Sequence, residues 1–305
     1  MAVPTYTPPN VLLSDAKTGY IPYSTEEITL DAIQQNSAYM QLARAETMTT
    51  LQKKFYYMTG IGAYWVSETE RIQTSKPTWQ EAEMKAHKLG VIIPASREFL
   101  TYTVSDFFAQ MQPRVAEAFY KKFDQAALYG LDNPYTQSIV NSATTAGQVV
   151  TAGANKYDDL NEAMGMIEQH DLSPTGIAAR RTQMQVYRGT KDTTGLPIFN
   201  APTAGAPGTL LGLPLSYVPQ GSADPASEVT EFIGDWQYAR YGILQGIRYE
   251  ILTEATLTTV AASDASGAPV SLAERDMMAL KATMMVGMIV LKDEAFSVIE
   301  TPATP

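Results

Sequence analysis

The chain has 305 residues, 45% of them hydrophobic, and it contains no cysteine. Lysine and arginine number 22 against 32 aspartates and glutamates, which gives a formal net charge of −10. This composition excludes disulfides and cysteine-based zinc sites, and the acidic balance argues against tight electrostatic binding of nucleic acid. The sequence does not open on a signal-peptide pattern, and no apolar run reaches the length of a membrane span. We therefore expect a soluble protein, used in a cytoplasm, without a membrane partner.

Residues 1–46 predict an arm rather than a folded domain. Four prolines in the first half of this segment favour extended backbone: Pro4, Pro8, Pro9 and Pro22. Apolar clusters between them favour an arm that docks on a surface over a floppy terminus. The second half, residues 26–46, is compatible with a helix that Thr25 caps.

Residues 47–90 predict a polar, two-stranded finger. Aromatic and β-branched residues favour a first strand from Leu51 to Val66, and a second strand follows from Thr78 to Ile93. The polar stretch between them, residues 68–77, forms the tip. The finger carries Trp65 and Trp79 but has no apolar face wide enough for a core. Because an isolated hairpin is marginally stable in water, we expect the finger to rest on another molecule, which points to assembly rather than catalysis.

A long amphipathic helix is predicted from its N-cap at Ser105 to its end at Gly130. Pro113 lies inside this pattern and is expected to kink or divide the helix. Residues 131–155 are expected to form a loop. Further elements are predicted at residues 158–169 (helix), 174–187 (strand or turn, then helix), 232–235 and 248–257 (strands) and 272–299 (strands with a methionine-rich face). Without a regular βαβ alternation, the predicted fold class is α+β.

The sequence carries no pattern that indicates catalysis. His87 and His170 are isolated and belong to no metal-binding motif. Four glutamates lie at alternate positions of the predicted finger: Glu68, Glu70, Glu81 and Glu83. At this spacing they form a solvated or salt-bridged face more simply than an acid pair. The pair Arg180–Arg181 is too small for a nucleic-acid site. We therefore expect no catalytic residue, no metal and no cofactor.

Five stretches resemble, in their order, the major capsid protein family of tailed bacteriophages, which has the Hong Kong 97-type coat fold. They are the finger (Trp65–Trp79), the strand that returns from it (His87–Leu100), the end of the long helix (Phe123–Leu131), the strands punctuated by glycine and proline (Gly195–Ile251) and the C-terminal stretch (Asp293–Glu300). Each stretch is a loose match alone, and their common order makes the resemblance specific.

The resemblance implies an L-shaped α+β subunit with four parts. These are an N-terminal arm (residues 1–46), an extended loop formed by the finger (47–90), a peripheral domain with a long spine helix (91–131 and 254–305) and an axial domain (132–253). It also implies that the finger contacts a neighbouring subunit. The residues selected for this contact are Trp65, Glu68, Glu70, Arg71, Lys76 and Trp79.

The resemblance further implies a structural protein that self-assembles into hexamers and pentamers of an icosahedral phage head around double-stranded DNA. The expected partners are copies of itself, a scaffolding protein and a portal, with only weak interior contact to the DNA. The expected location is the virion capsid, after assembly in the bacterial host cytoplasm. Two alternatives stay open: the shell of an encapsulin-like nanocompartment, and an unrelated hydrolase that uses the glutamates.

Overall fold

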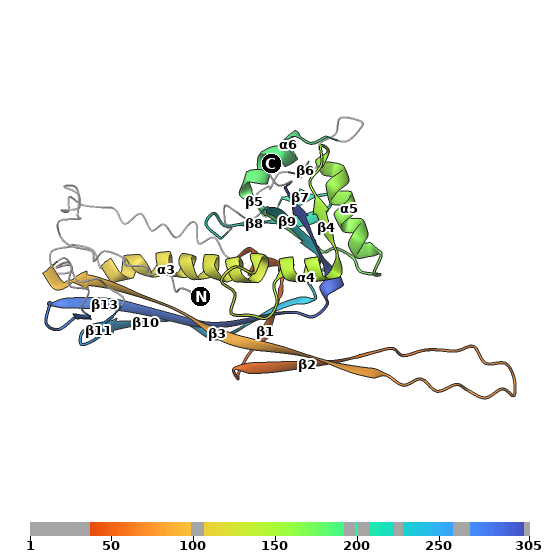
Figure 1. Cartoon of the computed structure of the whole chain (residues 1–305), viewed down its shortest axis with the longest axis horizontal. Coiled ribbons are helices and arrows are strands. Elements are labelled where there is room, and N and C mark those ends of the chain that lie inside the picture. Colours follow the sequence, from red (N-terminus) through yellow and green to blue (C-terminus); the bar gives the residue numbers. More distant parts are fainter. Residues whose placement is uncertain are drawn as a thin grey trace. The chain divides into compact units, whose positions relative to one another are not determined.

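Figure 1 shows the computed structural model of the chain, which describes residues 37–98, 107–191, 199–200, 208–222, 228–258 and 269–301. These residues form two compact units. The first is drawn from Lys88–Tyr120 and Gln245–Met285, and the second from Ser37–His87, Lys121–Leu244 and Val286–Pro305. Most of the predicted arm, residues 1–36, and the helix cap predicted at Ser105 lie outside the described residues.

A five-stranded sheet has the order β1-β10-β13-β3-β2. Its strands are β1 (Arg44–Thr47), β2 (Gln52–Thr59), β3 (Thr78–Ser96), β10 (Ala239–Leu252) and β13 (Met277–Val290). β1 runs parallel to β10, whereas β2 runs antiparallel to β3 with Gln52 opposite Lys85 and Thr59 opposite Thr78. This pairing confirms the two strands of the predicted finger, although the first ends at Thr59 rather than at Val66.

The second unit contains a seven-stranded sheet of order β4-β14-β9-β5-β8-β7-β6 (Figure 1). Its strands are β4 (Val149–Thr151), β5 (Gly176–Arg180), β6 (Phe199–Asn200), β7 (Thr209–Leu210), β8 (Leu213–Val218), β9 (Val229–Gly234) and β14 (Phe296–Glu300). Every residue of β9 is buried, and helices α4 (Ile139–Ala146) and α5 (Lys156–Glu168) pack on β14. Because β14 pairs with β4 and β9, the last described strand shares a sheet with residues 149–234.

The first unit has two apolar clusters. One surrounds the short strand pair β11 (Thr256–Leu257) and β12 (Val270–Ser271), and its buried members are Leu257, Val270, Leu272, Met277 and Ala279. In the other, Phe107 and Met111 pack against Ala95 and Leu280. Phe107 and Met111 belong to helix α3 (Phe107–Asp124), so this cluster attaches the helix to strands β3 and β13.

Helix α3 runs through Pro113 and continues as a π-helix, η3 (Gln125–Tyr129). The long helix is therefore confirmed, and it is not divided at Pro113: a proline removes only one hydrogen bond of the ladder, and the apolar face that α3 buries supports one continuous helix. The predicted end is confirmed. Gly130 adopts a left-handed conformation with φ of 71°, and its N–H group bonds to the carbonyls of Ala126 and Gln125.

Two further predictions need correction. Of the helix expected at residues 26–46, the described part contains a short helix, α1 (Ala38–Leu42), but ends in strand β1. The loop expected at residues 131–155 contains α4 and β4. The small residues of α4 give only a weak apolar periodicity, so the helix is hard to predict. Its two ends are nevertheless well defined: the side chain of Ser138 accepts a hydrogen bond from the N–H of Asn141, and Gly147 ends the helix with φ of 71°.

Other predicted elements are confirmed. Helix α5 covers the segment expected at residues 158–169, and β5, the 3₁₀ turn η4 (Arg181–Gln183) and helix α6 (Met184–Gly189) cover that expected at 174–187. The methionine-rich stretch includes β13, and the alternate positions of this strand are core residues. Those buried are Leu280, Met284, Val286, Met288 and Val290.

Gly234 ends β9 at a position that has no room for a side chain. A Cβ atom there would overlap the ring of Phe296 and lie 2.9 Å from the carbonyl oxygen of Ala295. We expect Gly234→Ala to lower the free energy of unfolding by about 1–3 kcal/mol, as measured by urea denaturation. The control is Gly246→Ala in β10, where an added Cβ meets nothing within 4 Å and the substitution is neutral or slightly stabilising. Equal effects of the two substitutions would contradict this account.

Candidate assembly surface

The outer part of the finger has no interior. Every residue from Gly60 to Lys76 is exposed, and none belongs to a helix or strand. We call residues 60–77 the finger tip. It turns at Ser67–Glu70, where the N–H of Glu70 donates to the carbonyl of Ser67 (3.1 Å) and the N–H of Ser67 donates to the carboxylate of Glu70 (3.3 Å).

Ser75 connects the two sides of the finger tip near its root. Its hydroxyl oxygen accepts a hydrogen bond from the N–H of Gly62 at 2.8 Å and lies 3.4 Å from the carbonyl oxygen of Gly60, to which the O–H donates. These contacts shape the tip but remove none of it from water. Its stability therefore depends on the strand pairing below it or on a partner molecule.

Large apolar side chains crowd this exposed segment and the start of β3. They are Ile61, Tyr64, Trp65, Val66, Ile72 and Trp79. The exposed fraction is 104% for Trp65, 82% for Ile72 and 65% for Trp79. Exposed apolar side chains that are concentrated on one segment are typical of interaction sites. The sequence prediction selected the two tryptophans and missed Ile61, Tyr64 and Ile72, which their apolar type inside a polar run could have shown.

The structure places the residues selected as inter-subunit contacts on one exposed element. Trp65, Glu68, Glu70, Arg71, Lys76 and Trp79 are all exposed, and all belong to the finger tip or to the first residues of β3. The carboxylate of Glu70 serves the local turn. The role of these residues in contacts between subunits stays a prediction.

The root of the finger is anchored by apolar and ionic contacts. Its apolar cluster contains Met48, Met84 and Ile289, with Phe55 and Leu244 packed against them. The carboxylate of Glu46 adds ion pairs with the Nζ of Lys53 (2.9 Å) and the guanidinium of Arg240. Partial burial favours the neutral carboxyl, but Lys53 and Arg240 outweigh it and hold the pKa of Glu46 below its ordinary value. These contacts fix the root of the finger to the neighbouring strands of the sheet.

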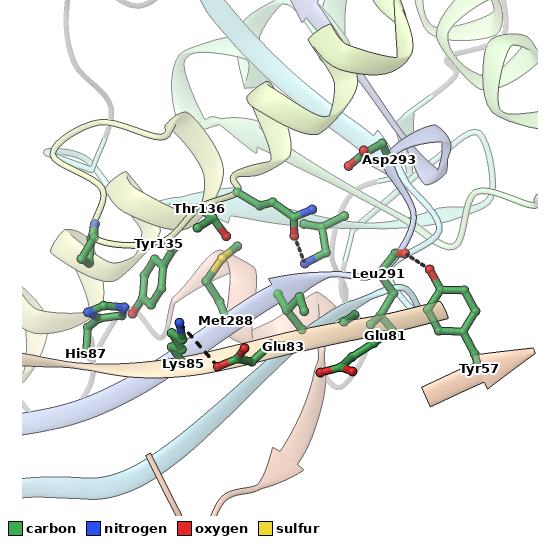
Figure 2. Close-up of a pocket in the computed structure, with 15 residues that line it drawn as sticks. Tyr57, Glu81, Glu83, Lys85, His87, Tyr135, Thr136, Met288, Leu291 and Asp293 are labelled. Carbon is green, nitrogen blue, oxygen red and sulfur yellow. Dashed lines mark hydrogen bonds and ion pairs between the residues drawn. The ribbon is translucent and has the colours of Figure 1, made fainter. Parts of the chain in front are cut away.

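A groove of about 670 Å³ lies beside this base (Figure 2). Its walls come from β2, β3, residues 134–137 and the end of β13. The His87 ring packs edge-on against Tyr135, with ring centres 5.2 Å apart, and the hydroxyl of Tyr57 donates to the carbonyl of Leu291 at 3.4 Å. The contacts of His87 with Tyr135 and of Tyr57 with Leu291 are thus a ring contact and a hydrogen bond to the backbone.

The glutamates of β3 form ion pairs, as their spacing predicted. Glu81 pairs with Lys54, and Glu83 lies 3.5 Å from the Nζ of Lys85. Neither is therefore available as half of an acid pair. Across the described ranges, no three His, Asp or Glu side chains gather as a metal site. Within the same ranges, none of the helices combines the length and the apolar character that crossing a membrane requires.

A buried carboxylate joins the start of the described chain to the end of α3. Asp124 accepts hydrogen bonds from the Ser37 hydroxyl and from the N–H groups of Ala38 (2.8 Å) and Tyr39 (3.3 Å). It therefore caps helix α1 from 87 residues away. Burial raises the pKa of Asp124 to about 6, although these three hydrogen bonds favour the charged form. The sequence alone gave no signal for this long-range pair.

A second buried carboxylate joins one strand of the seven-stranded sheet to two helices. Glu231 of β9 is fully buried and lies 2.6 Å from the Nζ of Lys156, the first residue of α5. The hydroxyl of Tyr187 in α6 donates to the same carboxylate at 2.5 Å. Burial raises the pKa of Glu231, against the opposing effects of Lys156 and Tyr187. We call these three residues the buried cluster.

Comparisons with known proteins agree with one another. The model of the phage capsid family matches residues 21–301. The major capsid protein of Staphylococcus phage 80alpha is 36% identical over 295 residues, which cover 96% of this chain and 88% of that protein. A solved structure from Microbacterium phage Oxtober96 has a TM-score of 0.74 at 25% identity and covers 92% of this chain and 96% of its own. One from Mycobacterium phage Adephagia has a TM-score of 0.76 at 21% identity and covers 97% and 99%.

The fold is therefore that of a phage capsid protein, the α+β Hong Kong 97-type fold of the resemblance. Because the family model matches most of the chain and a relative above 30% identity covers nearly all of it, the chain belongs to the phage capsid family. Its function is that of a major capsid protein of a tailed-phage head, a structural component of the virion capsid and not an enzyme. The matched relatives favour this function over a nanocompartment shell and over a hydrolase.

The different exposure of two tryptophans predicts a small loss of stability on substitution of one and a large loss on substitution of the other. Trp65 is fully exposed, whereas Trp236 is 1% exposed and donates its ring N–H to the carbonyl of Gly176 at 2.9 Å. We expect Trp65→Ala to change the free energy of unfolding of unassembled chain by less than about 0.5 kcal/mol. Trp236→Ala should lower it by about 3–5 kcal/mol. Urea denaturation checks both values, and a large loss of stability in Trp65→Ala would show that the finger tip packs on its own subunit.

Protonation of Asp124 is expected to stabilise the fold. Because its pKa is raised in the folded chain from 3.8 to about 6, its contribution to stability is fully present below about pH 4 and is lost as the pH rises through about 6. The free energy of unfolding of the wild type relative to Asp124→Asn, which cannot titrate, should therefore fall by up to about 3 kcal/mol between about pH 4 and pH 7. Urea denaturation across this range measures the difference, and a constant difference would contradict the raised pKa.

Proposed function

We propose that the chain assembles with copies of itself into hexamers and pentamers that close an icosahedral head around double-stranded DNA. In this proposal the finger tip of each copy lies across a neighbouring copy. The observation that carries it is the full exposure of residues 60–76, a segment that includes large apolar side chains. Self-assembly into a capsid is the property of the family to which the chain belongs.

The proposed contact has two components. Burial of a large apolar side chain contributes roughly 1.5–3 kcal/mol, so Trp65, Ile72 and Trp79 together would supply several kcal/mol for each finger. The charged residues Glu68, Arg71 and Lys76 lie around these apolar anchors, where they would set the register of the contact more than its strength.

The domain boundaries belong to the same proposal: an arm at residues 1–46, an extended loop at 47–90, a peripheral domain at 91–131 and 254–305 and an axial domain at 132–253. The length of α3 supports its role as the spine helix. The pairing of β14 with β4 and β9 favours assigning residues 296–300 to the axial domain instead.

A scaffolding protein and a portal are the further partners we propose. The net charge of −10 suits a shell that encloses DNA with weak interior contacts, because tight binding would need clustered lysine and arginine to displace counterions. Assembly in the cytoplasm of a bacterial host completes the proposal.

Deletion of residues 68–76 tests the finger. The deletion removes exposed residues alone, so we expect a subunit with wild-type thermal stability that forms no closed shells. Electron microscopy and sedimentation of the full chain, with and without the deletion, measure this outcome. A variant with the same nine positions replaced by glycine and serine separates the effect of the side chains from that of length. Normal shells from both variants would refute the role of the finger tip.

A further inference from the structure

Charge is segregated within the second unit. From Tyr157 to Ala179 the chain contains acidic residues and no lysine or arginine, whereas from Arg180 to Lys191 it contains basic residues and no aspartate or glutamate. The acidic stretch includes α5, and the basic stretch forms η4 and α6.

The first surface is a basic patch that consists of Arg181, Arg188 and Lys191. All three side chains are exposed. The guanidinium carbon of Arg181 lies 5.9 Å from the centre of the Tyr217 ring. Burial raises the pKa of the Tyr217 hydroxyl, and the charges of Arg181 and Arg188 counteract that rise. Arg188 belongs to α6, which follows η4 directly in the chain. Val186, which is 44% exposed, lies between Arg181 and Arg188 in sequence and adds an exposed apolar side chain to the patch.

The second surface is an acidic face on α5. Its members are Asp158, Glu162 and Glu168, with Asp171 just beyond the helix, and all are exposed. The helix buries Leu160, Ala163 and Ile167 on its opposite side, so the carboxylates point away from the seven-stranded sheet. Tyr157 at the start of the helix is 38% exposed and is the apolar counterpart of Val186.

The two surfaces do not neutralise each other within one copy. Among the described residues, no ion pair involves Arg181 or Arg188 of the basic patch, and none involves Glu162 or Glu168 of the acidic face. The buried cluster nevertheless connects the two helices that carry these surfaces. Lys156 begins α5, Tyr187 belongs to α6, and both contact Glu231. The basic patch and the acidic face are thus presented by elements that share one buried anchor.

We propose that the basic patch of one copy docks on the acidic face of the next copy within each ring-shaped capsomer, a proposal that rests on the proposed hexamers and pentamers. Identical copies in a closed ring meet head to tail, so each copy must present two different and complementary surfaces. Opposite charge and one exposed apolar side chain on each surface meet this requirement.

The ionic contacts act mainly on orientation. An exposed ion pair contributes little stability by itself, whereas complementary patches steer the approach of two copies and reject wrong arrangements. Because these charges are exposed, the assembly rate of the wild-type chain should fall as salt is raised. Repetition around the ring multiplies the effect of each pair.

A charge-swap experiment tests the proposal with the full chain. We expect Arg181→Glu with Arg188→Glu to reduce the yield of rings and shells by roughly tenfold or more, because acidic surfaces then face each other. Glu162→Lys with Glu168→Lys should do the same. These double variants shift the net charge in opposite directions. All four changes together restore the net charge and the complementarity, and should restore assembly. Sedimentation and electron microscopy measure the yield.

Arg181→Lys with Arg188→Lys is the matched control, which keeps the charge and should assemble normally. Wild-type yield of shells from the Arg181→Glu, Arg188→Glu variant would overturn the proposal, and if those shells failed to retain DNA, the patch would instead be a DNA contact. Failure of the fourfold variant to regain assembly would also overturn it, provided circular dichroism shows a folded chain. A wild-type chain that forms no rings would refute the proposed function itself. This result is distinguishable from the two variant results above, because it concerns the unaltered chain.

Discussion

The buried carboxylate of Glu231 is a constraint on which the arrangement of the second unit depends. A charge at a fully buried position is tolerated only when it is paired, and here the partners come from two different helices. Removing Lys156 would leave an uncompensated charge in the sheet, at a cost of about 3–5 kcal/mol. The ion pair with Lys156 of α5 and the hydrogen bond from Tyr187 of α6 therefore both attach their helices to β9. The surfaces that these helices present to other molecules depend on the same contact.

Asp124 and Glu46 apply the same principle elsewhere in the second unit. Asp124 fixes the start of the described chain to the end of α3, and Glu46 fixes the root of the finger to β10. Each carboxylate bonds to groups that are remote in sequence, so each closes a long loop of chain. Rigid roots for the arm and the finger are what extended elements need if they are to reach a neighbour in a defined direction.

Much of the fold and part of the candidate surface could be predicted from the sequence. The finger was evident because residues around Trp65 and Trp79 lack an apolar face wide enough for a core, and the end of the long helix was evident because Gly130 is a strong terminator. Helix α4 was missed because its small residues give little periodicity. The bonds that hold the start of α1 could not be foreseen because their acceptor, Asp124, lies far along the chain. The buried cluster was invisible for the same reason. Arg180–Arg181 looked like a minor pair because Arg188 lies farther along the chain, on helix α6.

The exposed finger tip has a consequence for the life of the free subunit. A chain that displays Trp65 and Ile72 to water is prone to associate with any apolar surface before it meets its proper neighbour. Folding of one copy therefore leaves these apolar side chains in water. In the proposed assembly other copies cover them, and the apparent stability of the protein then depends on its concentration. Before assembly, the same side chains favour aggregation of the free subunit.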